Sequence, residues 1–141
     1  MNNHSSLYLR SKIFAILNKK ILIVTERRAD YSKFRPIIKE IEKSKKMDYC
    51  LVVTGSHLLK EYGNTINQIK QDKFKISSKF HMYPKNNKNT NAEMVRSFAK
   101  AVNEISKIVE KIKPNIILAG FDIGANFAAE INGAHINIVV A

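Results

Sequence analysis

The stretch KILIVTERRADYSKFRP, residues Lys20–Pro36, sets the fold class. Its first six residues, Lys20–Thr25, form a continuous run rich in β-branched side chains, which is typical of a strand buried on both faces of a parallel sheet. A polar turn that carries Arg27, Arg28 and Asp30 follows, and a helical pattern begins after it. Such a turn presents helix N–H groups and cations at one edge of the sheet, which suits a phosphorylated ligand, although most turns of this kind bind nothing.

The helix after this turn has apolar residues three and four positions apart, the spacing of a buried helix face. These residues are Phe34, Ile37, Ile38 and Ile41. With Ser32 as the N-cap, Pro36 would fall in the first turn, where its missing N–H removes no helical hydrogen bond.

The alternation of strand and helix continues to the end of the chain. Buried strands are predicted at Asp48–Gly55, Asn115–Gly120 and His135–Ala141, with a shorter strand within Asp72–Met82. Helical segments are predicted at His57–Tyr62, from the capping box of Thr90 and Glu93 to Pro114, and at Asn126–Asn132. This rhythm predicts an α/β, Rossmann-like parallel sheet flanked by helices.

Composition narrows the class of protein. The 141 residues suffice for one domain, and no apolar run approaches the roughly 20 residues that span a bilayer, so no membrane partner is expected. Residues 1–19 are interpreted as an appended helix or lead-in.

Cysteine content and charge bear on the compartment and the partners. A single cysteine, Cys50, excludes an internal disulfide and favours the cytoplasm. The net charge of +12 comes mostly from scattered lysines with no nucleic-acid motif, so no nucleic-acid partner is expected.

The candidate site lies where strands end, because ligands of open α/β sheets bind at the carboxyl ends of the strands. Three turns meet this condition: Thr25–Ser32, Thr54–His57 and Gly120–Asn126. Gly55, Gly120 and Gly124 would permit close backbone approach or positive φ there.

Within these turns, Arg28 is the candidate phosphate or ribose clamp, and Ser32 is a hydroxyl or N-cap donor. Asp122 is the candidate acid, base or hydroxyl-binding carboxylate, with a helix cap as the alternative. For Arg27 a solvated side chain is preferred, and for His57 a surface or helix-capping role. The other histidines are dispersed, so no metal site is proposed.

Three segments carry a resemblance to a known family: RADYSKFRP, TGSHLLKEYGNTINQI and KPNIILAGFDIGANFAAEINGAHINIVVA. In this order they resemble the N-terminal half of the hydrolysing UDP-N-acetylglucosamine 2-epimerases, and the resemblance runs from Lys20 to Ala141. The non-hydrolysing epimerases carry a GTRPE-type turn after the first strand, which this chain lacks.

The resemblance implies a glycosyltransferase-B-like fold of two Rossmann-like domains with the sugar nucleotide between them. Elimination of UDP followed by addition of water would give N-acetylmannosamine, the first intermediate of sialic-acid-type sugars, without a cofactor or metal. Arg28, Ala29 and Ser32 would contact the UDP portion, and Asp122 would lie at the reacting sugar. Full-length members are expected to be homo-oligomers.

The sequence departs from the family pattern in two places. Many members have GDR where this chain has GFDIG, which displaces Asp122 by one residue and puts Ile123 where an arginine would stand. Members also continue with a HIxGGE-type segment and a second domain beyond the position of Ala141. The expectation is therefore a lead-in, 1–19, and a truncated N-terminal epimerase domain, 20–141, without activity alone. The alternatives are a stand-alone nucleotide-binding domain and an epimerase for a 2,4-diacetamido UDP-sugar.

Overall fold

The computed structural model of the chain describes residues 18–86, 88, 90–120, 124–136 and 138–141. Its centre is a five-stranded, all-parallel sheet in the order β3-β2-β1-β4-β5. The strands are β1 (Lys19–Thr25), β2 (Met47–Val53), β3 (Ile76–Lys79), β4 (Ile116–Leu118) and β5 (Val139–Val140). The helices are α2 (Arg28–Lys43), α3 (Ile66–Gln71), α4 (Asn91–Ile112) and α5 (Ala125–His135), with short 3₁₀ turns η1 (Gly55–Leu58) and η2 (Lys60–Tyr62). The predicted parallel α/β sheet is confirmed.

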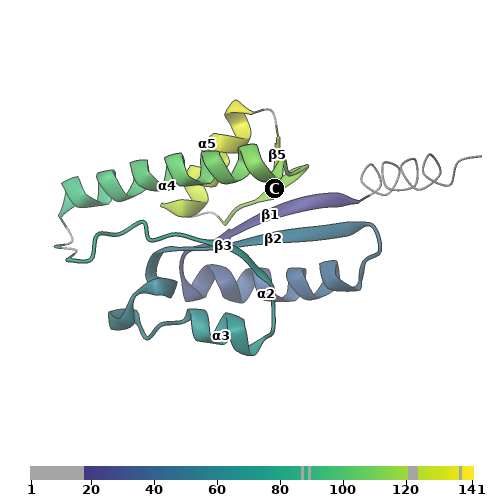
Figure 1. Cartoon of the computed structure of the whole chain (residues 1–141), viewed down its shortest axis with the longest axis horizontal. Helices are drawn as coiled ribbons and strands as arrows, with labels where there is room; N and C mark the ends of the chain where they lie inside the picture. Colours follow the sequence, from purple (N-terminus) through teal and green to yellow (C-terminus); the bar gives the residue numbers. More distant parts are fainter. Residues whose placement is uncertain (1–17, 87, 89, 121–123, 137) are drawn as a thin grey trace, which may run out of the picture.

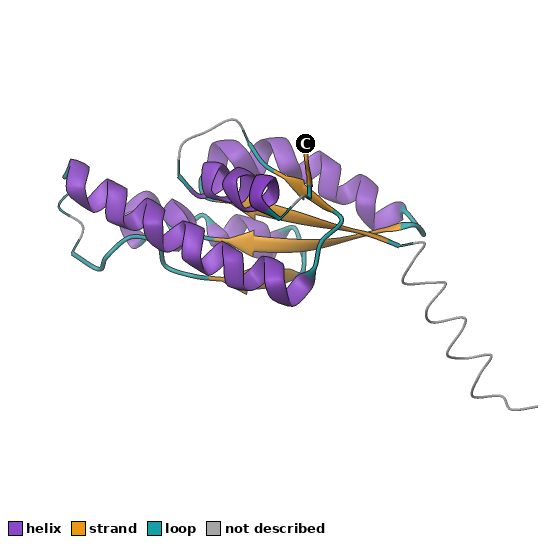
Figure 2. Cartoon of the chain, turned by 90° about the horizontal axis from the view of Figure 1, so that it is seen from above, coloured by secondary structure: helices purple, strands orange, loops and turns teal. Residues whose placement is uncertain are grey.

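The helices cover both faces of the sheet, α2 and α3 below it and α4 and α5 above it in Figure 1. Figure 2, the view from above, shows helices running lengthwise over the strands. Alternate side chains of β1 pack on opposite faces of the sheet. Ile21 and Ile23 pack toward α2, and Leu22 and Val24 pack toward α4 and α5. Two apolar layers therefore hold β1 from both faces, which explains its continuous apolar run.

The start of α2 differs from the prediction. The helix begins at Arg28 with Arg27 as its N-cap, because the carboxylate of Asp30 accepts hydrogen bonds from the backbone N–H groups of Arg27 at 3.1 Å and Glu26 at 3.3 Å. Ser32 is not the N-cap, and Pro36 lies inside the helix rather than in its first turn. Ile37 is also 40% exposed, although Phe34, Ile38 and Ile41 are buried as expected.

The long helix α4 follows its predicted signals at both ends. Thr90 caps it and accepts a hydrogen bond from the N–H of Glu93 at 3.2 Å, and the helix ends before Pro114. The apolar spacing in the sequence predicts a buried stripe made of Val95, Phe98, Val102, Ile105, Val109 and Ile112. Ile105 and Val109 are fully buried as predicted, and Phe98, Val102 and Ile112 pack partly buried against the core, while Ser97 and Ala101 are buried in addition. Val95, the first residue of the predicted stripe, is instead 67% exposed.

The last part of the sheet is smaller than expected. Only Val139–Val140 form β5, and both valines are exposed at the sheet edge. None of the helices in the described part of the chain combines the length and the apolar character that crossing a membrane requires.

Candidate functional site

The three turns predicted to form the site meet at the carboxyl edge of the sheet. The N–H of Thr54 donates to the carbonyl of Thr25 at 3.0 Å, and the N–H of His57 donates to the carbonyl of Glu26 at 3.3 Å. After β4, the N–H of Gly120 donates to the side-chain oxygen of Asn126 at 2.9 Å. The ends of β1 and β2 are therefore joined by hydrogen bonds, and the turn after β4 is closed by a bond within itself.

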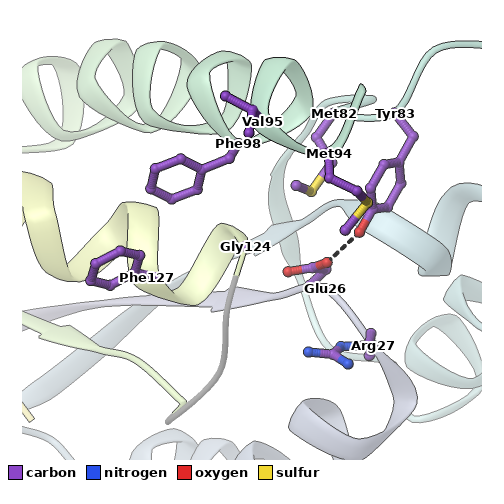
Figure 3. A pocket seen from close by; sticks show the side chains of 9 residues that line it. All are labelled: Glu26, Arg27, Met82, Tyr83, Met94, Val95, Phe98, Gly124 and Phe127. Atoms are coloured by element: carbon purple, nitrogen blue, oxygen red, sulfur yellow. Dashed lines mark hydrogen bonds between the residues drawn. The ribbon is translucent and has the colours of Figure 1, made fainter. Parts of the chain in front are cut away.

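Glu26, the residue directly after β1, lies at the centre of this edge. One carboxylate oxygen accepts the hydroxyl proton of Tyr83 at 2.6 Å (Figure 3). The other accepts the N–H of Ala125, in the first turn of α5, at 2.8 Å. The residue is only 3% exposed. Burial raises the pKa of its carboxyl group, while the bonds from Tyr83 and Ala125 act in the opposite direction.

Two glycines make room for this carboxylate. Gly55 has a φ of +61° and Gly124 a φ of +99°, and a Cβ atom added to either would overlap the side chain of Glu26. Glycine is therefore required at both positions for conformation and for space. The expectation of positive φ holds at these two positions.

Asp30 and Asn126 join the starts of α2 and α5. The Asn126 side-chain amide donates to the same Asp30 oxygen that caps α2, at 3.1 Å, while its oxygen accepts from Gly120. Both side chains are buried. The two helix N-termini are thus held in a fixed relation across the sheet edge.

His57 is a buried structural residue, so the expected surface or helix-capping role is wrong. Its Nε2 lies 2.9 Å from the hydroxyl of Thr25 and its Nδ1 lies 2.6 Å from the hydroxyl of Thr65. Burial lowers its pKa from 6.5 to about 4, so the ring is neutral at physiological pH. The neutral ring links η1 to β1 and to the start of α3.

A pocket of about 390 Å³ opens beside Glu26. Its walls are mostly apolar and come from the loop after β3 and from α4 and α5: Met82, Met94, Val95, Phe98 and Phe127. The rings of Phe98 and Phe127 stack with centroids 5.5 Å apart and planes 16° from parallel. Glu26, Arg27 and Tyr83 supply its polar groups (Figure 3). The pocket therefore combines an apolar enclosure with one carboxylate and one guanidinium.

The residues predicted for UDP lie beside this pocket and do not line it. Arg28, Ala29 and Ser32 are exposed on the first turns of α2, and the Ser32 hydroxyl donates to the Arg28 carbonyl at 2.8 Å. Arg27, expected to be solvated, is exposed and also lines the pocket. Asp122 lies outside the described residues.

Glu26 is the main site residue that the sequence reasoning missed. The available signal was its position: a carboxylate placed directly after a strand with no exposed face must be buried with partners. Those partners come from Tyr83 and Ala125, which lie 57 and 99 positions away, so no local pattern identifies them.

The fold is shared with solved epimerase structures. The crystal structure of UDP-GlcNAc 2-epimerase from Neisseria meningitidis, bound to UDP-GlcNAc, superposes with a TM-score of 0.72 at 20% identity, covering 86% of this chain and 30% of that one. The UDP-GlcNAc 2-epimerase of Methanocaldococcus jannaschii gives 0.64 at 19% identity, covering 87% and 30%. These likenesses confirm the Rossmann-like architecture expected for the N-terminal half of a glycosyltransferase-B-like fold.

Sequence relatives agree with this fold. The UDP-N,N'-diacetylbacillosamine 2-epimerase (hydrolyzing) of Legionella pneumophila is 34% identical over 123 residues, which is 86% of this chain and 32% of the relative. The UDP-N-acetylglucosamine 2-epimerase of Neisseria meningitidis serogroup B is 28% identical over 100 residues, covering 71% and 25%. The chain thus spans a third or less of the length of these relatives.

Family membership is shown by a family model that matches most of the chain. Residues 39–141 match the family model described as UDP-N-acetylglucosamine 2-epimerase. This region holds β2, β4, α4 and α5, which carry two of the three turns of the candidate site. The chain therefore belongs to the UDP-N-acetylglucosamine 2-epimerase family.

Proposed function

We propose that this chain is the N-terminal part of a hydrolysing UDP-N-acetylglucosamine 2-epimerase, which converts UDP-N-acetylglucosamine to N-acetylmannosamine and UDP in the cytoplasm for sialic-acid-type sugars. The family match over residues 39–141 carries this proposal. The convergence of three strand-end turns beside a pocket supports it, because such an edge is where parallel α/β sheets bind nucleotides.

In this proposal the exposed first turn of α2 binds the UDP portion. The guanidinium of Arg28 faces the diphosphate, where paired N–H donors would stabilise UDP as a leaving group. Ala29 and Ser32 lie on the same exposed helix start and would contact the nucleotide. Asp122 is proposed as the carboxylate at the reacting sugar, where it handles a proton or holds a hydroxyl during the elimination.

Residues 20–141 would then form one wall of the substrate cleft. The two relatives are about three and four times as long as the regions matched in them, which make up 32% and 25% of their lengths. We expect the 141-residue chain by itself to bind UDP weakly and to release no N-acetylmannosamine from UDP-N-acetylglucosamine.

A second candidate substrate is a 2,4-diacetamido UDP-sugar. The apolar pocket favours it, because a second acetamido methyl would bury against Met94, Phe98 and Phe127, whereas a free hydroxyl there would lose hydrogen bonds to water. The Legionella relative carries a substrate name of this type. Comparing the affinities of the two UDP-sugars for the chain separates the candidates, and tighter binding of the diacetamido sugar would favour the second.

Calorimetric titration with UDP tests the binding half of the proposal. Arg28→Ala is expected to weaken UDP binding at least about tenfold, because a charge-assisted bond to phosphate is worth roughly 1.5–3 kcal/mol. Lys39→Ala is the matched control, since it removes one cation from the same helix farther from the sheet edge. Equal affinities of the wild-type and Arg28→Ala chains would contradict the assignment of Arg28.

A further inference from the structure

We infer that Glu26 determines where the phosphates of the ligand bind. Its carboxylate fills the anion position at the N-terminus of α5, so the diphosphate lies on the Arg28 side of the edge and the uncharged sugar faces the apolar pocket. The identity of the ligand, a nucleoside diphosphate sugar, rests on the proposed function. The binding of the Glu26 carboxylate at the N-terminus of α5 rests on contacts within this chain.

The N-terminus of α5 would otherwise be a natural place for a phosphate. It follows β4 at the carboxyl edge of a parallel sheet, and its first N–H groups and positive dipole end attract anions. The N-cap, Gly124, has no side chain to satisfy these groups. The N–H of Ala125 is instead bound by Glu26, a carboxylate from the end of a different strand.

Space as well as charge keeps a phosphate away from this helix end. A single Cβ atom added to Gly124 would already overlap the carboxylate of Glu26, so no phosphate oxygen fits between them. The second carboxylate oxygen is held by Tyr83, which fixes the side chain in this position. A second carboxylate, Asp30, binds the Asn126 side chain from the same helix turn. The Glu26 carboxylate at the Ala125 N–H would repel a diphosphate from this helix end, whereas Asp30 lies in the first turn of α2 and does not distinguish the two helix ends.

The pocket on the other side of Glu26 suits an uncharged group. Among the described residues that line it, methionine, valine and phenylalanine side chains offer apolar contact, and Arg27 is the one cation. Acetamido groups combine an apolar methyl with hydrogen-bonding atoms, so they match these walls with Glu26 and Tyr83 close by. The arrangement orients the ligand with its sugar toward α4 and α5 and its diphosphate toward α2.

Inorganic pyrophosphate and UDP, titrated into the ¹⁵N-labelled 141-residue chain, test this orientation. Pyrophosphate should shift the amide signals of Arg28 and Ala29 in the wild type and leave those of Ala125 and Asn126 unchanged. Glu26→Ala removes both the charge and the bulk, so Ala125 and Asn126 should respond and the affinity for pyrophosphate should rise by about tenfold. Glu26→Gln keeps the bulk, and Ala125 should stay unresponsive.

Glu130→Gln is the matched control, because it removes one negative charge from α5 outside the pocket and should behave as the wild type does. A response of Ala125 in the wild type, or no response of Ala125 in folded Glu26→Ala, would overturn the inference. If Glu26→Ala does not fold, the wild type and Glu26→Gln still test the inference, since a shift of the Ala125 signal with pyrophosphate in either protein contradicts it.

The proposed function is tested separately. If UDP shifts no amide signal at the start of α2, the proposed function is contradicted, whereas the response of Glu26→Ala to pyrophosphate does not depend on that function.

Discussion

Two helices begin at the same edge of the sheet, and their N-termini are built in different ways. The start of α2 follows β1 and carries Arg27, Arg28 and Ala29, all exposed. The start of α5 follows β4 and is buried, with Ala125 bound to the carboxylate of Glu26. Both starts are bound by a carboxylate, but α2 is capped by its own Asp30 and presents exposed arginines, whereas the first N–H of α5 is bound by Glu26 from the end of another strand.

This difference shows that a helix N-terminus is a ligand site only if the rest of the fold leaves it open. At α5 the anion comes from the chain itself, and the cost of burying it is offset by Tyr83, by Ala125 and by the dipole of the helix. At α2 the carboxylate of Asp30 binds the N–H groups of Glu26 and Arg27 and leaves Arg28 at the surface.

The largest expected effect comes from Gly124→Ala, which disrupts the start of α5. The added Cβ overlaps Glu26 and forces a non-glycine residue to a φ of +99°, so we expect a loss of about 3 kcal/mol in the free energy of unfolding. Gly63→Ala is the control: its φ is +80° but no atom lies near its added Cβ, so only about 1 kcal/mol should be lost. Urea denaturation measures both, and equal losses would argue against the close packing of Gly124 on Glu26.

The second effect is that the free energy of unfolding depends on pH through His57, which is buried at the same edge of the sheet. Its pKa is about 4 in the folded chain and 6.5 when unperturbed, so between these values the unfolded chain binds more protons and stability falls as the pH drops. Between pH 7 and pH 5 this amounts to about 2 kcal/mol. His57→Gln should remove that part of the dependence.

Exposed His81 offers the matched control for this measurement, since His81→Gln also removes one histidine but leaves the contacts of His57 in place. The raised pKa of Glu26 acts with the opposite sign and is present in every variant, so the difference between variants isolates His57. Parallel stability curves for His57→Gln and the wild type would contradict the buried neutral ring.

A smaller effect is expected from Phe127→Ala in the apolar wall beside α5. Phe127 stacks on Phe98 and is 44% exposed, so its removal should lower the free energy of unfolding by about 1 kcal/mol. The affinity for UDP should not change, whereas the additional affinity of a UDP-sugar over UDP should fall. A loss of UDP affinity itself would place the nucleotide in the pocket and contradict the separation of the two turns.

The smallest effect is expected for Ser32→Ala at the start of α2. Its hydroxyl donates only to the Arg28 carbonyl within the helix, and alanine is the better helix former, so stability should change by less than about 0.5 kcal/mol. Any loss of UDP affinity in this variant therefore reports a direct contact. Unchanged UDP affinity would remove Ser32 from the proposed nucleotide contacts.

Local patterns in the sequence were sufficient to predict most elements of the sheet. The run at Lys20–Thr25 and the capping box at Thr90 and Glu93 each depend on neighbours within a few residues, and both are confirmed. The start of α2 was placed wrongly because Asp30 competes with Ser32 as the capping group, and Asp30 bonds to the backbone before it.

The centre of the site depends on contacts between distant segments, and these could not be predicted. The position of Glu26 directly after a buried strand is a local sign of its burial, but its partners Tyr83 and Ala125, like the Thr65 partner of His57, come from other segments that no local pattern identifies. The turns themselves were predicted, because the carboxyl ends of parallel strands must share one edge.

A crystal structure of the chain with UDP tests the central claim most directly, because it shows which helix N-terminus holds the diphosphate. We predict diphosphate oxygens within hydrogen-bond distance of the Arg28 guanidinium, with the Ala125 N–H still bonded to the Glu26 carboxylate. A phosphate oxygen on the Ala125 N–H, with Glu26 displaced from α5, would contradict the account.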